Sequence, residues 1–181
     1  MEYDIDKLKF PIGKFTAPIT IDNQTIVKWI EIIQFFPDHL KKEVLELSEK
    51  ELQKTYRPDG WSIRQIIHHC ADSHMNSLIR FKLTLTEDIP TIKPYAEDLW
   101  AELIDSKELA INSSINILEG LHHRWVVLLQ SMIPSDLTKQ FRHPESNDLI
   151  DIKTNIGLYA WHCEHHLAHI KIAKMNELWS I

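Results

Sequence analysis

The sequence has little of what defines several protein classes. Glycine occurs at only four of 181 positions, which argues against a fold built on many tight turns. The two cysteines, Cys70 and Cys163, lie inside helical patterns, so we expect no disulfide framework and a reducing, cytoplasmic location. No apolar run reaches 18 residues and the first residues, MEYDIDKLKF, are charged, so we expect neither a membrane-spanning helix nor a signal peptide.

The sequence also lacks an excess of positive charge, with 20 Lys and Arg against 26 Asp and Glu. The formal net charge is −6, which disfavours nucleic acid as a partner because phosphate binding needs a basic surface. The remaining composition is that of an ordinary globular protein, with 44% hydrophobic and 25% charged residues. A chain of 181 residues can bury a sizeable core, so we expect one domain over residues 1–181.

Four long segments carry apolar residues at the three- and four-residue spacing of an amphipathic helix. The first contains Pro37, which we expect to kink or restart it, and the second begins at Ser62 and Gln65, a capping-box pair. Four long helices without a clear strand register predict an all-α four-helix bundle. The helices are expected from Asp22 to about Leu47, from Ser62 to about Leu85, from Asn112 to Met132, and from Asp151 to near Trp179.

Shorter segments connect these helices. Residues 1–21 contain two prolines and a glycine and are predicted to form an extended N-terminal arm. A second small cap at Ser48–Glu51 and a short helix from Leu99 to Ile104 are expected as accessory elements. Residues 140–150 are rich in turn-forming residues and predict a small hairpin or a loop.

Histidine is what the sequence has in excess. The segment WHCEHHLAHI (161–170) places His162, His165, His166 and His169 within eight positions, where the chain average would give about half a histidine. Leu158, His162, His165 and His169 follow one another at three- and four-residue steps and form a helix stripe that has the spacing of a bundle's inward seam. His162 with His166, and His165 with His169, are both pairs four residues apart, and helix geometry alone does not choose between the pairs.

A metal ion would explain why several imidazoles lie together on an inward face. Each buried imidazole needs partners for its nitrogens, and an unsatisfied buried polar group costs about 1–3 kcal/mol. His69 is the better third ligand, because it shares a polar stripe with Ser73, Asn76 and Arg80, whereas His74 lies on the apolar stripe. A surface position is the alternative for His69. His122 and His123 are expected to be surface or packing residues.

Three imidazoles suit zinc, and also nickel, cobalt or iron. Three protein ligands leave an open position for water, whose pKa such an ion lowers towards about 7, or for a thiolate. The HExxH motif of zinc proteases is absent. Asn76 and Arg80 are candidates for binding a substrate carboxylate or phosphate.

The sequence resembles the DinB superfamily, and within it the YfiT-like metal-dependent hydrolases. The resemblance covers nearly the whole chain and implies a four-helix bundle with a divalent metal held by His69, His165 and His169. It implies that His162 and His166 lie beside these ligands, and that the protein is a cytoplasmic homodimer. The resemblance rests on FPIGKF (10–15), YRPDGWSIRQIIHHCADSHMNSLIRFKLTLTE (56–87), PTIKPY (90–95), LHHRW (121–125), FRHP (141–144) and GLYAWHCEHHLAHI (157–170).

Together these features predict a hydrolase that acts on a small molecule through a metal-bound water. Zinc is the favoured metal and nickel the alternative. A second hypothesis is a metal-dependent S-transferase that uses a low-molecular-weight thiol such as bacillithiol, because other branches of the superfamily resemble such enzymes. A third is a non-catalytic bundle in which the metal only joins helices.

Overall fold

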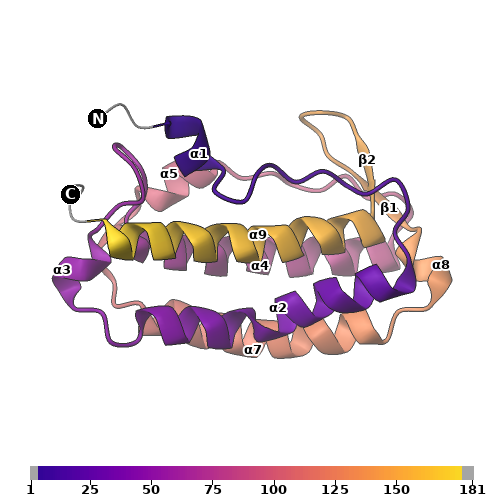
Figure 1. Ribbon diagram of the computed structural model, residues 1–181. Coiled ribbons are helices and arrows are strands. Elements are labelled where there is room, and N and C mark those ends of the chain that lie inside the picture. The colour runs from indigo at the N-terminus through magenta and orange to yellow at the C-terminus, as the bar shows by residue number, and fades with distance from the viewer. Residues whose placement is uncertain (1–3, 177–181) are drawn as a thin grey trace.

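Four long helices form the body of the protein in a computed structural model that describes residues 4–176 (Figure 1). They are α2 (Asn23–Val44), α4 (Ile63–Thr86), α7 (Asn112–Gln130) and α9 (Ile152–Met175). The predicted all-α four-helix bundle is confirmed. The expected end of the last helix near Trp179 lies outside the described residues.

The four helices pack as a ring around one core. α2 packs against α7 and α9, and α4 packs against the same two helices, so α2 and α4 lie at opposite corners. Figure 1 shows α9 and α4 in one layer and α2 and α7 in the other. The core contains fully buried side chains from each of these helices, among them Phe36, Phe81, Trp125 and Ile156.

Polar side chains define where the long helices begin. The Ser62 hydroxyl accepts the Gln65 backbone N–H at 3.2 Å, and the Gln65 carboxamide accepts the Ser62 N–H at 2.9 Å, which confirms the predicted capping box. Asp22 and Asp151 accept backbone N–H groups at the starts of α2 and α9.

Helix α2 runs through Pro37 as one helix, so of the two expected outcomes, a kink or a restart, the restart does not occur. Proline has no N–H, and the carbonyl of Ile33 therefore lacks the helical donor that residue 37 would otherwise supply. Both Ile33 and Pro37 are buried. That carbonyl has another donor, described below.

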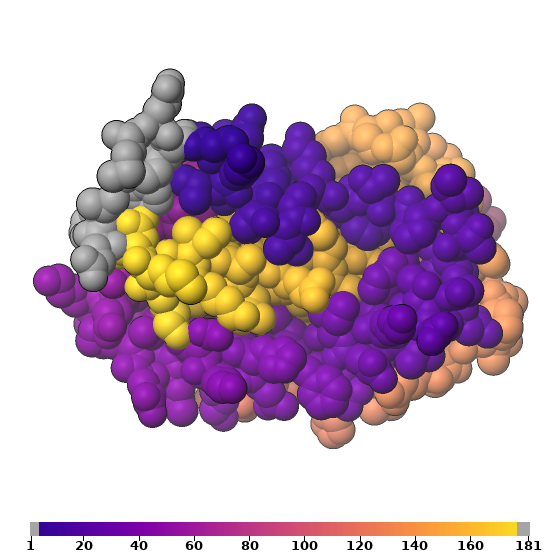
Figure 2. Space-filling view, in the orientation of Figure 1, coloured from indigo at the N-terminus to yellow at the C-terminus, as the bar shows by residue number. Residues whose placement is uncertain are grey.

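The N-terminal arm lies across α9. It is not fully extended, because α1 (Ile5–Lys9) forms a short helix capped by Asp4. The following residues run along α9, and Figure 2 shows them covering part of that helix. The Trp161 indole N–H donates to the carbonyl of Gly13 at 3.0 Å, which attaches the arm to α9.

Short elements complete the fold. Pro134 is the first residue of a short helix, where a missing N–H costs nothing. The turn-rich segment forms a two-stranded antiparallel hairpin, and the short helix expected near Leu99 is divided into two. None of the helices within residues 4–176 combines the length and apolar composition that a membrane crossing requires. The short elements are α3 (Glu49–Leu52), α5 (Glu97–Ala101), α6 (Ile104–Glu108), α8 (Pro134–Leu137), β1 (Gln140–Arg142) and β2 (Leu149–Asp151).

Candidate metal centre

A cavity of about 410 Å³ lies between α4, α9 and the N-terminal arm. Five histidines line it, one from α4 and four from α9. Aromatic side chains, two acidic residues (Glu97 and Asp98) and two basic residues (Lys9 and Arg57) complete the wall. The predicted histidine face of the last helix therefore borders a cavity. The five histidines are His69, His162, His165, His166 and His169.

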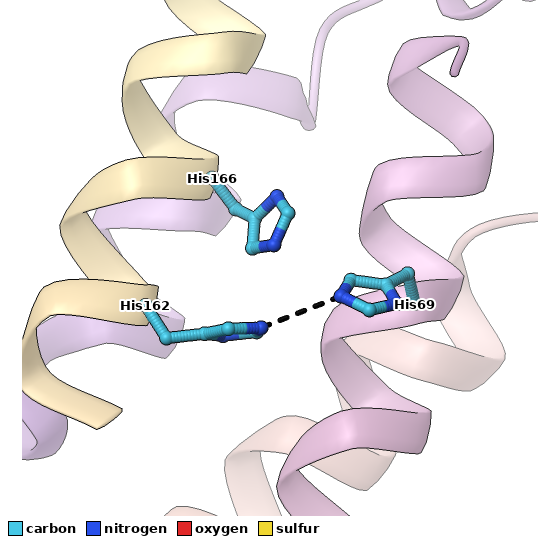
Figure 3. A group of neighbouring side chains, drawn as sticks. All are labelled: His69, His162 and His166. Carbon is cyan, nitrogen blue, oxygen red and sulfur yellow. Dashed lines mark hydrogen bonds between the residues drawn. The ribbon is translucent and has the colours of Figure 1, made fainter. Parts of the chain in front are cut away.

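Three of these histidines come from two helices and meet at one point. The ligand atoms of His69, His162 and His166 all lie within 4.8 Å of one another. Figure 3 shows the three rings directed into the space between α4 and α9, with the Nε2 atoms of His69 and His162 3.3 Å apart. Two nitrogens bound to one tetrahedral zinc at about 2.0–2.1 Å lie about 3.3–3.4 Å apart, so this pair has the spacing that the ion requires.

A second group consists of His165, His166 and His169, all from α9. His166 belongs to both groups. The triple expected from the resemblance, His69 with His165 and His169, does not form one such group among the described residues, whereas each of its members belongs to one of the two.

Hydrogen bonds and ring contacts restrict the second group. The His169 Nε2–H donates to the Lys9 carbonyl at 3.2 Å, so that nitrogen has no lone pair free for a metal. The His169 ring stacks on Tyr56 at 3.9 Å and the His165 ring stacks on Trp161 at 4.4 Å. The Nδ1 atoms of His165, His166 and His169 are buried, and none has a hydrogen-bond partner within the described chain. Buried nitrogens without partners are the kind of atoms that a bound ion or substrate would satisfy.

Burial keeps all five rings neutral at physiological pH. It lowers the pKa of His69 and His165 to about 4, and burial together with His165 lowers the pKa of His169 to about 3. Burial and the neighbouring histidines lower the pKa of His162 and His166 well below the ordinary value. Neutral imidazole is the form that binds a metal, so no proton has to leave the site first.

Behind His162 lies a chain of hydrogen-bonded histidines that crosses the bundle. The His162 Nδ1 is 3.0 Å from the Nε2 of His74, whose Nδ1 is 2.7 Å from the Nε2 of His122. The His122 Nδ1 lies 2.6 Å from the carbonyl oxygen of Ile33. His74 and His122 are buried, whereas His123 is exposed. Sequence reasoning placed His74 on the apolar stripe and took His122 for a surface or packing residue, and so missed this connection.

The other predicted residues lie around the site. The Asn76 amide donates to the Asp72 carbonyl of its own helix at 2.9 Å, and Asn76 is not among the described residues that line the histidine cavity. Arg80 lines a neighbouring cavity of about 640 Å³, which shares His162, Glu97 and Asp98 with the first. Arg80 thus lies beside the histidine cavity and does not line it.

The two cysteines take no part in the site. Cys70 and Cys163 are buried and free, and burial raises the pKa of both thiols. His68, next to His69, faces a different part of the protein, where its nitrogens contact the Ser114 hydroxyl and the Leu109 carbonyl.

Fold and site together define a helical bundle with an internal cluster of neutral histidines suited to a divalent metal. Residues 34–170 match the DinB superfamily, and the chain belongs to that superfamily.

Similar proteins in Bacillus carry a name that agrees with this site. "Putative metal-dependent hydrolase" from Bacillus mycoides (strain KBAB4) is 50% identical over 172 residues, which cover 95% of this chain and 98% of that protein. A protein of the same name from Bacillus cereus (strain 03BB102) is 49% identical over 175 residues, covering 97% and 100%.

A solved structure agrees with the fold as well. YfiT from Bacillus subtilis, described as "a probable metal-dependent hydrolase with an unusual four-helix bundle topology", superposes with a TM-score of 0.92 at 41% identity. The match covers 96% of this chain and 99% of that one. The relatives and the histidine cluster both imply a metal, but neither identifies it.

Proposed function

We propose that this protein is a hydrolase of small molecules that depends on one divalent metal, with zinc as the favoured ion and nickel as the alternative. The metal is held by His69, His162 and His166. The observation that carries the proposal is the 3.3 Å separation of two neutral Nε2 atoms from different helices, with a third imidazole beside them. The triple expected from the resemblance, His69 with His165 and His169, is the alternative ligand set.

When bound, such an ion polarises a substrate oxygen and lowers the pKa of water towards about 7. Three protein ligands leave coordination positions open towards the cavity. The rings of Trp61 and Trp161, which contact His69 and His165, limit the access of bulk water. The pKa of Glu97 is raised, mainly by partial burial and to a smaller extent by the negative charge of Asp98. This carboxylate on the cavity wall is the proposed acceptor of the proton that water loses.

Metal analysis of single variants tests the site. The protein, purified without a nickel column, is analysed as wild type, His162→Ala, His169→Ala and His68→Ala. We expect one transition metal per chain in the wild type, loss in His162→Ala, and retention in His169→Ala and in the His68→Ala control. Loss in His169→Ala with retention in His162→Ala would support the alternative ligand set. A wild type that takes up no metal after zinc addition would refute the proposal.

The reaction class needs a separate assay, because the same open site would serve thiol transfer. Neither cysteine lines the cavity, so a transferase would need an external thiol. Metal-loaded protein is given activated esters, amides and alkyl halides in ¹⁸O-labelled water, with and without a low-molecular-weight thiol. Incorporation of ¹⁸O without thiol supports hydrolysis. Turnover only with thiol identifies a transferase, and a bound metal without turnover supports a non-catalytic bundle.

The expected homodimer and cytoplasmic location stay predictions. Sedimentation of the metal-loaded protein measures the first, and fractionation of the source cells measures the second. A dimer would leave the proposed ligands unchanged, because all three belong to one chain.

A further inference from the structure

One break in the hydrogen bonds of α2 has an unusual partner. In an α-helix the carbonyl of Ile33 accepts the N–H of residue 37, but that residue is Pro37 and has no N–H. Ile33 is fully buried, so water cannot take the place of the missing donor. The donor is the Nδ1–H of His122, 2.6 Å away on α7.

This contact determines where the protons of the next two rings lie. A carbonyl oxygen only accepts, so the proton of neutral His122 is on Nδ1 and its Nε2 carries a lone pair. His74 Nδ1, 2.7 Å from that Nε2, must therefore donate, which leaves the Nε2 of His74 as an acceptor. His162 Nδ1, 3.0 Å from it, must donate in turn. The remaining nitrogen of His162 is Nε2, unprotonated and 3.3 Å from the Nε2 of His69 (Figure 3).

We propose that the Ile33 carbonyl, freed by Pro37, sets the tautomers of His122, His74 and His162 so that His162 presents a bare Nε2 to the metal. His74 and His122 are thus positioning residues that act through His162. The choice of His162 as a ligand rests on the proposed function. The tautomer order itself is a property of the chain without metal.

Both nitrogens of His74 are engaged within the chain. The chain has one further contact, the Ser73 hydroxyl 3.4 Å from the Nε2 of His162, and a hydroxyl can donate to an unprotonated nitrogen. His74 is fully buried, and the rings of Phe36, Trp125 and Tyr159 lie 5.3–5.9 Å from it, centroid to centroid. These aromatic side chains carry no carbonyl or carboxylate oxygen that could accept from the Nε2 of His74 and so reverse the direction of the hydrogen bonds. A ligand whose second nitrogen donates to a fixed acceptor is held in orientation and tautomer, which strengthens metal binding in known sites.

The first experiment reads the tautomers directly. Protein labelled with ¹⁵N-histidine and freed of metal is examined by long-range ¹H–¹⁵N NMR, with single variants to assign the signals. The expected result is that His122, His74 and His162 all carry the proton on Nδ1. A proton on Nε2 of His162 would overturn the inference, whatever the protein's affinity for metals.

The second experiment measures zinc affinity by competition with a chromophoric chelator. In His74→Leu the acceptor for His162 is lost, and we expect binding about 10–100-fold weaker. In His74→Gln the amide oxygen replaces that acceptor, and most of the affinity should return. The control is His68→Leu, which removes a buried, hydrogen-bonded histidine of the same helix outside the chain. Its affinity should equal that of the wild type.

Equal zinc affinity in His74→Leu and wild type would overturn the positioning role. If His74→Leu fails to fold, the NMR of the wild type still tests the tautomer order, and the zinc affinity of His74→Gln still tests the positioning role. A wild type that binds no zinc would refute the proposed function and the ligand role of His162. The NMR result would then still confirm or overturn the tautomer order.

Discussion

Two sets of histidines meet at one cavity, and they differ in whether their ring nitrogens have hydrogen-bond partners. In the inner chain, formed by His122, His74 and His162, every ring nitrogen lies within hydrogen-bond distance of a defined partner. In the outer group, formed by His165, His166 and His169, all three Nδ1 atoms are buried without a partner among the described residues. The inner chain ends on a backbone carbonyl, whereas the outer group opens into the cavity.

The comparison shows that burial alone does not identify a ligand. His68 and His69 are adjacent and equally buried, yet His68 has a hydroxyl and a carbonyl as partners, whereas His69 faces other imidazoles. A histidine between fixed donors and acceptors is structural. A histidine whose nitrogen faces another lone pair needs an ion or a proton between the two.

The largest effect is expected where the inner chain meets the metal. His162→Ala removes a proposed ligand and leaves the Nε2 of His74 without its donor, so zinc should bind more than about 100-fold more weakly, beyond the usual loss for an outer partner. Chelator competition measures it. The outer-group variant His165→Ala should lose much less, and equal losses in the two variants would remove the distinction between the sets.

The acid stability of the metal-free protein should reveal the neutral rings. Burial lowers the pKa of His69 and of His122 to about 4, whereas an unfolded histidine titrates near about 6.5. As the pH falls from about 6.5 towards 4, these histidines become protonated in the unfolded chain but stay neutral in the folded protein. Each such ring should therefore lower the free energy of unfolding by up to about 1.4 kcal/mol per pH unit in that window.

Urea unfolding at several pH values measures this slope. His122→Gln should flatten it, and His123→Gln, at the exposed neighbouring position, should not. A free energy of unfolding that stays constant between pH 6.5 and 4 would show that the buried rings do not resist protonation in the fold.

A smaller effect is expected when the N-terminal arm, which lies over the outer group, loses its hydrogen bond to α9. Trp161→Phe keeps an aromatic ring but removes the indole N–H that donates to the Gly13 carbonyl, a loss of about 1 kcal/mol for one hydrogen bond. Hydrogen exchange of residues 10–21 should quicken, while the inner chain keeps its protection. Unchanged exchange of the arm would mean that this bond does not hold it.

Much of this arrangement could be predicted from the chain, because apolar spacing and caps act locally. Ser62 with Gln65, Asp22 and Asp151 begin helices where expected. The histidine face and the place of His69 on a polar stripe also follow from helix periodicity. These features depend on neighbours within one turn, which the sequence displays directly.

The grouping of the histidines depends on how two helices are rotated against each other. His162 and His165 are three residues apart, so they project only about 60° apart on the helix surface, and periodicity alone lets either of them face α4. Which of them meets His69 is decided by the packing of α4 on α9. The hydrogen-bond partner of His122 could not be predicted for a related reason, because the carbonyl of Ile33 belongs to another helix, α2.

The smallest change in zinc affinity is expected at the start of the inner chain. Pro37→Ala restores an N–H that can reach the Ile33 carbonyl, and α2 should gain stability because proline disfavours a helix interior. A carbonyl has two lone pairs, so the bond from His122 weakens but persists. A weakened hydrogen bond costs at most about 1.5 kcal/mol, so zinc affinity should fall by less than about tenfold. A variant more stable to urea, yet weaker for zinc, would show that the inner chain depends on a defect in α2. An increase in both urea stability and zinc affinity would show that the His122 contact only replaces the hydrogen bond that the proline cannot make.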